Sequence, residues 1–169
     1  GITLASAWNL HGSNPTAAIG YNWKTGTRTI RPHYHALALI MNHLEPAIVE
    51  TRVSSPTFAV DRVFNVKSHS AVPLLHAVAF SSPGQRRLSL MVINRSLTAG
   101  IPTAIRFQGF TPQTGAQVWT LSGNCLRDHN ENLSTTVAPR PGQITDAGVS
   151  FSYTFGAHSL TVMEFQAQP

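Results

Sequence analysis

The first 46 residues combine one strand-like run with one helix-like run. Apolar residues dominate positions 2–10, and a polar stretch over 11–29 that contains Gly and Pro interrupts them. Pro32 then occupies a favourable first position for a helix. Apolar residues recur at helical spacing after it and predict one packing stripe. That stripe consists of Leu37, Ile40, Met41 and Leu44.

A strand, a long loop and a helix make one β/α unit over residues 1–46. One such unit cannot cover both faces of its strand and the stripe of its helix, so it needs neighbouring units or another domain. The rest of the chain offers no second β/α unit. We therefore expect residues 1–46 to come from a larger parallel architecture, such as a (β/α)8 barrel.

From residue 47 onward, short strand-like runs replace the helical pattern. Clear alternation of apolar and polar residues occurs over 149–155, and the run 88–93 is apolar on both faces apart from Ser89, which predicts a central strand. The predicted strands cover 47–53, 57–65, 73–81, 86–94, 101–108, 115–121, 148–155 and 159–166. The fold class is therefore mainly β: an eight-stranded β-sandwich or jelly roll over 47–169, preceded by the β/α unit.

Residues 122–147 interrupt this strand pattern with a long polar segment that contains Pro and Gly. Loops of this length are usually functional or packed against another domain. We therefore expect residues 122–147 either to carry a function or to pack against another domain.

Composition and charge narrow the function classes. Hydrophobic residues make up 42% of the chain and charged residues only 11%. Low charge is common in extracellular β proteins, so it favours an extracytoplasmic location without fixing the compartment. The net charge is +5, but the cations are scattered singly apart from the adjacent Arg86 and Arg87 and do not form a stripe with aromatics, which argues against nucleic-acid binding. No apolar run of about 18 residues predicts a membrane-spanning helix.

The titratable residues do not form a recognisable catalytic or metal-binding pattern. Glycosidases usually need two carboxyl groups that face one scissile bond, and none of the 7 acidic residues has such a predicted partner. His33 and His35 stand two apart on a helix and point to different faces, so they cannot chelate a metal together. We therefore predict no catalytic residue, no metal and no cofactor within this chain.

The end of the first predicted strand carries the candidate binding residues. In a β/α barrel, side chains at the carboxyl ends of strands line the active site. Trp8 is suited to stack on a sugar, and Asn9 and His11 can hydrogen-bond to hydroxyl groups. We assign these three residues as candidate substrate contacts, with core packing of Trp8 and a plain loop role for His11 as the alternative.

Several segments in order resemble the family-51 glycoside hydrolases, which are chiefly α-L-arabinofuranosidases. The segment 31–37, running into 41–44, resembles the last barrel helix of that family. The segments 90–97, 121–139 and 158–165 are similar to a sandwich strand, a long sandwich loop and the closing strand. The resemblance implies a last barrel unit over 1–46 followed by a C-terminal jelly roll over 47–169.

The resemblance also implies what this chain lacks and what it binds. The two catalytic glutamates of the family lie on earlier barrel strands, upstream of Gly1. On the eighth strand the family often has a Gln that contacts the sugar, and His11 stands there instead. The implied role is structural support of a catalytic barrel. The implied partners are that barrel and arabinan or arabinoxylan as polysaccharide. Because the strand in residues 1–46 has lost its barrel neighbours, we also expect a homodimer through residues 1–46.

Two other functions remain open from the residues alone. The sandwich could be an independent carbohydrate-binding module, in which case a coplanar exposed pair among Tyr21, Trp23 and Trp119 is expected. It could instead be a small stand-alone hydrolase. That function requires a pocket around His129 or His76 with a nucleophile at hydrogen-bond distance.

Overall fold

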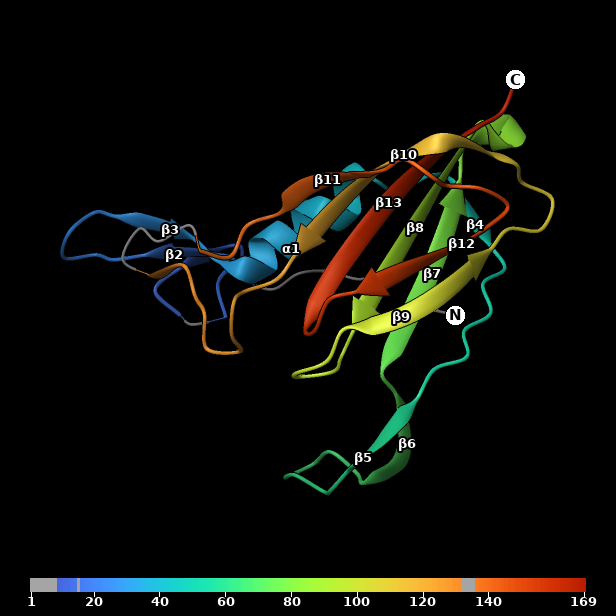
Figure 1. The fold of residues 1–169 in the computed structure, drawn as a ribbon. Coiled ribbons are helices and arrows are strands. Elements are labelled where there is room, and N and C mark those ends of the chain that lie inside the picture. Colours follow the sequence, from blue (N-terminus) through green and yellow to red (C-terminus); the bar gives the residue numbers. More distant parts are fainter. Residues whose placement is uncertain (1–8, 15, 132–135) are drawn as a thin grey trace.

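A computed structural model describes residues 9–14, 16–131 and 136–169. The predicted strand 2–10 lies almost entirely outside the described residues. A six-stranded antiparallel sheet forms the centre of the fold, in the order β11-β10-β13-β8-β7-β4 (Figure 1). Its strands are β4 (Ala47–Val49), β7 (Leu75–Ser81), β8 (Arg87–Asn94), β10 (Pro112–Leu121), β11 (Arg140–Ile144) and β13 (Ser159–Ala167). Strand β8 pairs with both β7 and β13, which confirms the prediction of a central strand.

A two-stranded sheet covers one face of this central sheet. Strands β9 (Ile101–Arg106) and β12 (Ser150–Phe155) pair antiparallel, and their alternating apolar residues point inward. A hydrophobic cluster fills much of the space between the two sheets. Its largest fully buried members are Phe155, Met163 and Phe165. The predicted β-sandwich is confirmed.

The helix α1 (Pro32–Asn42) packs on the opposite face of the six-stranded sheet (Figure 1). Leu39 is 4% exposed, and Ala36 and Ile40 pack beside it. Of the stripe predicted from the sequence, only Ile40 belongs to this packing face. Leu37, Met41 and Leu44 remain 41%, 65% and 40% exposed. The reason is that α1 is apolar on two sides, and helical spacing alone does not say which side meets the sheet.

Several strands appear where the sequence predicted loops. The stretch predicted as a polar loop over 11–29 contains a small sheet of β1 (His11–Gly12), β2 (Ile19–Tyr21) and β3 (Arg28–Ile30). Strand β11 lies within the predicted loop 122–147 and pairs with β10.

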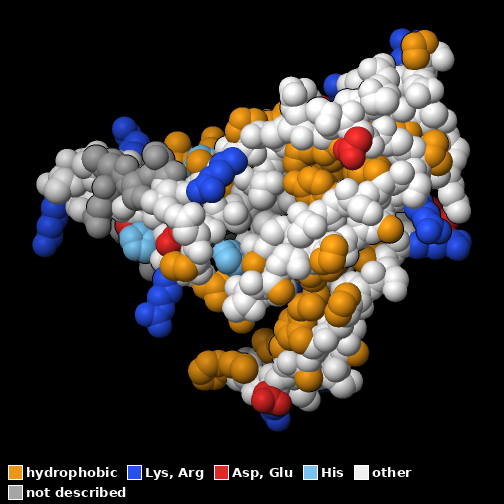
Figure 2. Space-filling view, in the orientation of Figure 1, with side chains coloured by type: hydrophobic (Ala, Val, Ile, Leu, Met, Phe, Trp, Pro, Cys, Tyr) orange, Lys and Arg blue, Asp and Glu red, His pale blue; other side chains and the backbone are white. Residues whose placement is uncertain are grey.

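The predicted strand 57–65 is shorter in the structure. It forms β5 (Thr57–Val60), which pairs with β6 (His69–Pro73). Figure 1 shows this hairpin projecting from the body, and Figure 2 shows hydrophobic side chains along it. A short 3-10 turn, Pro83–Gln85, joins β7 to β8. None of the described helices is long and apolar enough to cross a membrane.

Candidate functional site

The candidate site lies where the segment 9–31 meets the sandwich loop around residues 122–139. Of the predicted substrate contacts, Trp8 lies outside the described residues. The Asn9 carbonyl accepts a hydrogen bond from the Ala18 amide at 3.0 Å, and the Asn9 side chain donates to Thr16 Oγ1 at 3.3 Å. Asn9 has a positive φ of 61°, a conformation that Asn tolerates better than most residues. These bonds fix the turn that presents His11.

An aromatic row extends outward from His11. The ring centroids of His11 and Tyr21 lie 5.2 Å apart, and those of Tyr21 and Trp23 lie 4.4 Å apart. Arg28 pairs with Tyr21 across β2 and β3, and its guanidinium lies 5.7 Å from the centre of the Tyr21 ring. The row therefore continues from a predicted sugar contact to the hairpin between β2 and β3.

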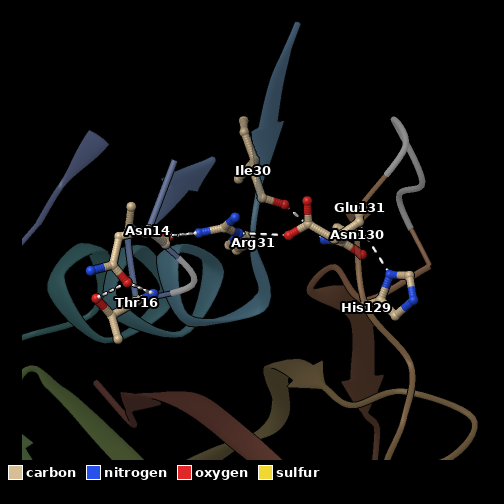
Figure 3. Close-up of polar contacts among 8 residues, drawn as sticks. Asn14, Thr16, Ile30, Arg31, His129, Asn130 and Glu131 are labelled. Carbon is tan, nitrogen blue, oxygen red and sulfur yellow. Dashed lines mark hydrogen bonds and ion pairs between the residues drawn. The ribbon is translucent and has the colours of Figure 1, made fainter. Parts of the chain in front are cut away.

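Arg31 ties this segment to the sandwich (Figure 3). Its Nη1 donates to the carbonyls of Asn14 at 2.5 Å and Ala17 at 2.9 Å, and its Nε donates to Glu131 Oε1 at 2.6 Å. The backbone of Gly20 passes so close that an added Cβ would lie 3.0 Å from Arg31 Nη2. One guanidinium thus organises the turn behind His11 and binds it to the sandwich loop.

Asn130 makes the second connection in the same region. Its side chain is fully buried, and its amide donates to the carbonyls of Ile30 at 3.0 Å and Val137 at 2.7 Å (Figure 3). Its Oδ1 accepts from the Val137 amide at 2.9 Å. The polar loop predicted over 122–147 therefore packs against the N-terminal segment, as one of the two expectations stated.

A compact turn precedes Asn130. The carboxylate of Asp128 accepts hydrogen bonds from the Asn124 amide at 2.6 Å and from the amide and thiol of Cys125 at 3.2 and 3.1 Å. The bond from the Cys125 thiol, followed by those from the two amides, holds the pKa of the Asp128 carboxyl below its usual range. Gly123 is required there, because an added Cβ would lie 2.8 Å from the Asp128 Cβ.

Two polar side-chain contacts fix the other end of α1. His43 Nδ1 lies 2.6 Å from Glu164 Oε1, and the His43 ring packs on Trp119 with centroids 4.1 Å apart. The Arg87 guanidinium donates to the buried Glu45 carboxylate, and this bond raises the pKa of Arg87. Helix α1 is thus held by apolar packing in its middle and polar contacts at its end.

Most carboxylates of the chain are committed to such structural partners. Glu45, Glu131 and Glu164 pair with Arg87, Arg31 and His43, and Glu50 pairs with Arg52. Over the described ranges, no group of three or more His, Cys, Asp or Glu side chains could hold a metal ion. These contacts suit a structural role in which the sandwich holds residues 9–31 and α1 in place.

A carbohydrate-binding module requires a coplanar aromatic pair, and a stand-alone hydrolase requires a nucleophile beside His129 or His76. The described residues show neither feature. The rings of Tyr21 and Trp23 stand at 87° to each other, and Trp119 packs beneath α1, so no coplanar platform forms among them. His129 Nδ1 accepts a hydrogen bond from the Glu131 amide. No nucleophilic side chain is hydrogen-bonded to His129 or His76 within the same ranges.

The sequence reasoning did not assign a role to Arg31 or Asn130. Both occur in segments that carry the family resemblance, but neither residue type by itself indicates a side chain that connects two segments through hydrogen bonds. Only local sequence features could have pointed to these two residues. Arg31 stands directly before the first helical Pro, and Asn130 is followed by Glu in a long polar loop.

The fold defines the chain as an antiparallel β-sandwich with one helix-bearing segment docked on its central sheet. The family model of the α-L-arabinofuranosidase C-terminal domain matches residues 14–159. The chain therefore belongs to the α-L-arabinofuranosidase C-terminal domain family. The search of curated proteins returned no match.

Solved structures agree with this assignment. The thermostable GH51 α-L-arabinofuranosidase from Thermotoga petrophila RKU-1 is 29% identical, with a TM-score of 0.79, over 89% of this chain and 32% of that chain. The arabinose complex of the α-L-arabinofuranosidase from Thermotoga maritima is 28% identical, with a TM-score of 0.79, over 90% and 32%. A GH51 arabinofuranosidase from Xanthomonas axonopodis pv. citri shares the fold at 16% identity, with a TM-score of 0.73, over 92% and 30%. The chain thus spans about a third of the length of these enzymes and corresponds to an accessory domain.

Proposed function

We propose that the chain acts as the C-terminal region of an α-L-arabinofuranosidase of glycoside hydrolase family 51. In this role it supports a catalytic barrel and shapes the rim of its active site. It does not hydrolyse glycosides by itself, because most of its carboxylates serve structural pairs and hydrogen bonds. The GH51 enzymes that it resembles are three times its length, which leaves room for a barrel beside the matched region.

The exposed side of α1 is the observation that carries this proposal. One side of the helix packs on the sandwich through Leu39, while Leu37, Met41 and Leu44 stay exposed on the other. Exposed apolar residues grouped on one side of a helix mark a surface that contacts another element. We infer that the free side docks on the neighbouring elements of a barrel, so that α1 lies between barrel and sandwich.

The same geometry supports different roles for the two regions of the chain. We propose that residues 1–46 form the last unit of the barrel and that residues 47–169 form the supporting sandwich. Trp8, Asn9 and His11 then stand at the active-site rim as sugar contacts. Arg31 and Asn130 hold that rim at a fixed position through their bonds to both segments. The polysaccharide of the whole enzyme would be arabinan or arabinoxylan.

In the isolated chain, the apolar side of α1 has no barrel to cover it. A second copy could cover it in a symmetric contact that also pairs the open edges of the N-terminal segment. We therefore propose a homodimer through residues 1–46 when the chain is produced alone.

A fusion enzyme tests the supporting role. The chain replaces the matched third of the Thermotoga petrophila enzyme, and hydrolysis of an aryl α-L-arabinofuranoside is measured. We expect the fusion to be active and the variant L37K/M41K to lose most activity, because two charges would face the barrel. The matched control is V63K, which places a charge at another exposed apolar residue, on the projecting hairpin. A folded but inactive fusion, or full activity of L37K/M41K, would contradict the proposal.

A further inference from the structure

The hairpin formed by β2 and β3 presents an exposed aromatic corner. Trp23 is 70% exposed, whereas Tyr21 beneath it is half-buried and meets it edge to face. An exposed Trp that rests on a second aromatic ring offers a flat apolar face at a defined angle. Large aromatic residues fixed at a surface are typical contact points for ligands.

The turn that carries Trp23 is held rigidly by Asn22. The Asn22 amide donates to the Thr27 carbonyl at 3.0 Å, and its own carbonyl accepts from the Gly26 amide at 2.8 Å. Its side-chain oxygen accepts from the amides of Lys24 at 3.0 Å and Thr25 at 3.4 Å. A preorganised turn loses little conformational entropy when a ligand binds.

The corner also has a positive charge without neutralisation. Residues 9–30 contain Lys24 and Arg28 but no Asp or Glu. Arg31 is neutralised by Glu131, whereas no carboxylate within the described ranges forms an ion pair with Lys24 or Arg28. Figure 2 shows Lys and Arg side chains at the end of the molecule where β2 and β3 lie. The corner therefore combines an aromatic face with two cations that no described carboxylate neutralises.

We propose that this corner binds a polysaccharide whose sugars carry carboxylate groups. The face of Trp23 stacks on a sugar ring, and Lys24 and Arg28 pair with a uronate on the same or the next sugar. The inference rests on the proposed function in one respect: the row His11, Tyr21, Trp23 connects the corner to the proposed active-site rim. A single platform with two cations is too small for the continuous basic track that a nucleic acid requires.

Binding of the full chain to glucuronoxylan, compared with the same polymer after reduction of its carboxyl groups to alcohols, tests the proposal. By affinity electrophoresis at low salt, we expect at least tenfold weaker binding to the reduced polymer. W23A should weaken binding to both polymers tenfold or more. K24Q/R28Q should weaken binding only to the native polymer, down to the level of the reduced one. R106Q removes an exposed cation from β9 as the matched control and should bind like the unmodified chain.

Circular dichroism and the urea midpoint verify that each variant is folded, and W23F offers a milder change should W23A not fold. Equal binding of the two polymers, no effect of W23A, or the same loss in R106Q overturns the proposal. Tighter binding of single-stranded DNA than of glucuronoxylan also overturns it and points to nucleic acid. If the polysaccharide does not bind at the corner while the fusion enzyme is active, only this inference is rejected. Corner binding with an inactive fusion rejects the supporting role alone.

Discussion

Replacement of Leu39 by Ala measures how strongly α1 is held on the sandwich. Leu39 is 4% exposed and contacts a buried cluster made of Met91, Leu121, Val137 and Val162. Removal of a leucine from such a site typically costs about 2–5 kcal/mol, because apolar contacts are lost and a cavity remains. The other wall is a six-stranded hydrogen-bonded sheet, so we expect little collapse and a cost of at least about 3 kcal/mol.

The matched control is L37A, which changes the same residue type two positions earlier on the same helix. Leu37 is 41% exposed in the single chain, so its loss should cost less than about 1 kcal/mol when unfolding is measured at a protein concentration at which the chain is monomeric. Urea unfolding followed by circular dichroism gives both free energies, and hydrogen exchange of the α1 amides reports undocking directly. Equal costs, or a larger cost for L37A, would refute the packing face assigned to α1.

Three further predictions follow from the site. N130A should cost about 2–4 kcal/mol, because the buried amide and carbonyl of Val137 and the partly buried carbonyl of Ile30 lose their partner. A cost below about 1 kcal/mol in urea unfolding would contradict the connecting role of Asn130. The pKa of Asp128 is lower in the folded chain than in the unfolded one, so its stabilisation is complete above about pH 4 and is lost as the pH falls through the folded pKa. Amide NMR signals of the turn 123–128 from pH 6 to pH 2 check this, and signals that stay unchanged throughout oppose it. Light scattering should show a dimer for the chain and for V63K but a monomer for L37K/M41K; a monomer throughout removes the homodimer.

Alternation of apolar and polar residues predicted the sandwich because its strands have one buried and one exposed face. This is clearest in β12, where half-buried or buried Phe151, Tyr153 and Phe155 alternate with exposed Ser and Thr. Strand β11 escaped prediction since four of its five residues are exposed and its sequence contains Pro and Gly. At such an edge strand, pairing with β10 rather than burial creates the strand.

The candidate site was harder to predict because its contacts join distant parts of the chain. Arg31 and Glu131 stand 100 positions apart, as do Ile30 and Asn130. Local sequence patterns carry no information on such distant pairs. The candidate substrate contacts at the end of the first predicted strand, in contrast, could be proposed from their position alone. Trp23 was recognised as a surface aromatic, but its perpendicular placement on Tyr21 depends on a hairpin that the polar sequence concealed.

Hydrolysis of an aryl α-L-arabinofuranoside by the purified chain tests the central claim most directly. The claim is that this region supports catalysis without performing it, so turnover should not exceed that of buffer. A general acid and a nucleophile together supply many orders of magnitude in rate, and neither role is assigned to a residue here. Steady turnover that survives repurification and disappears on replacement of one of the 7 acidic residues would contradict the account.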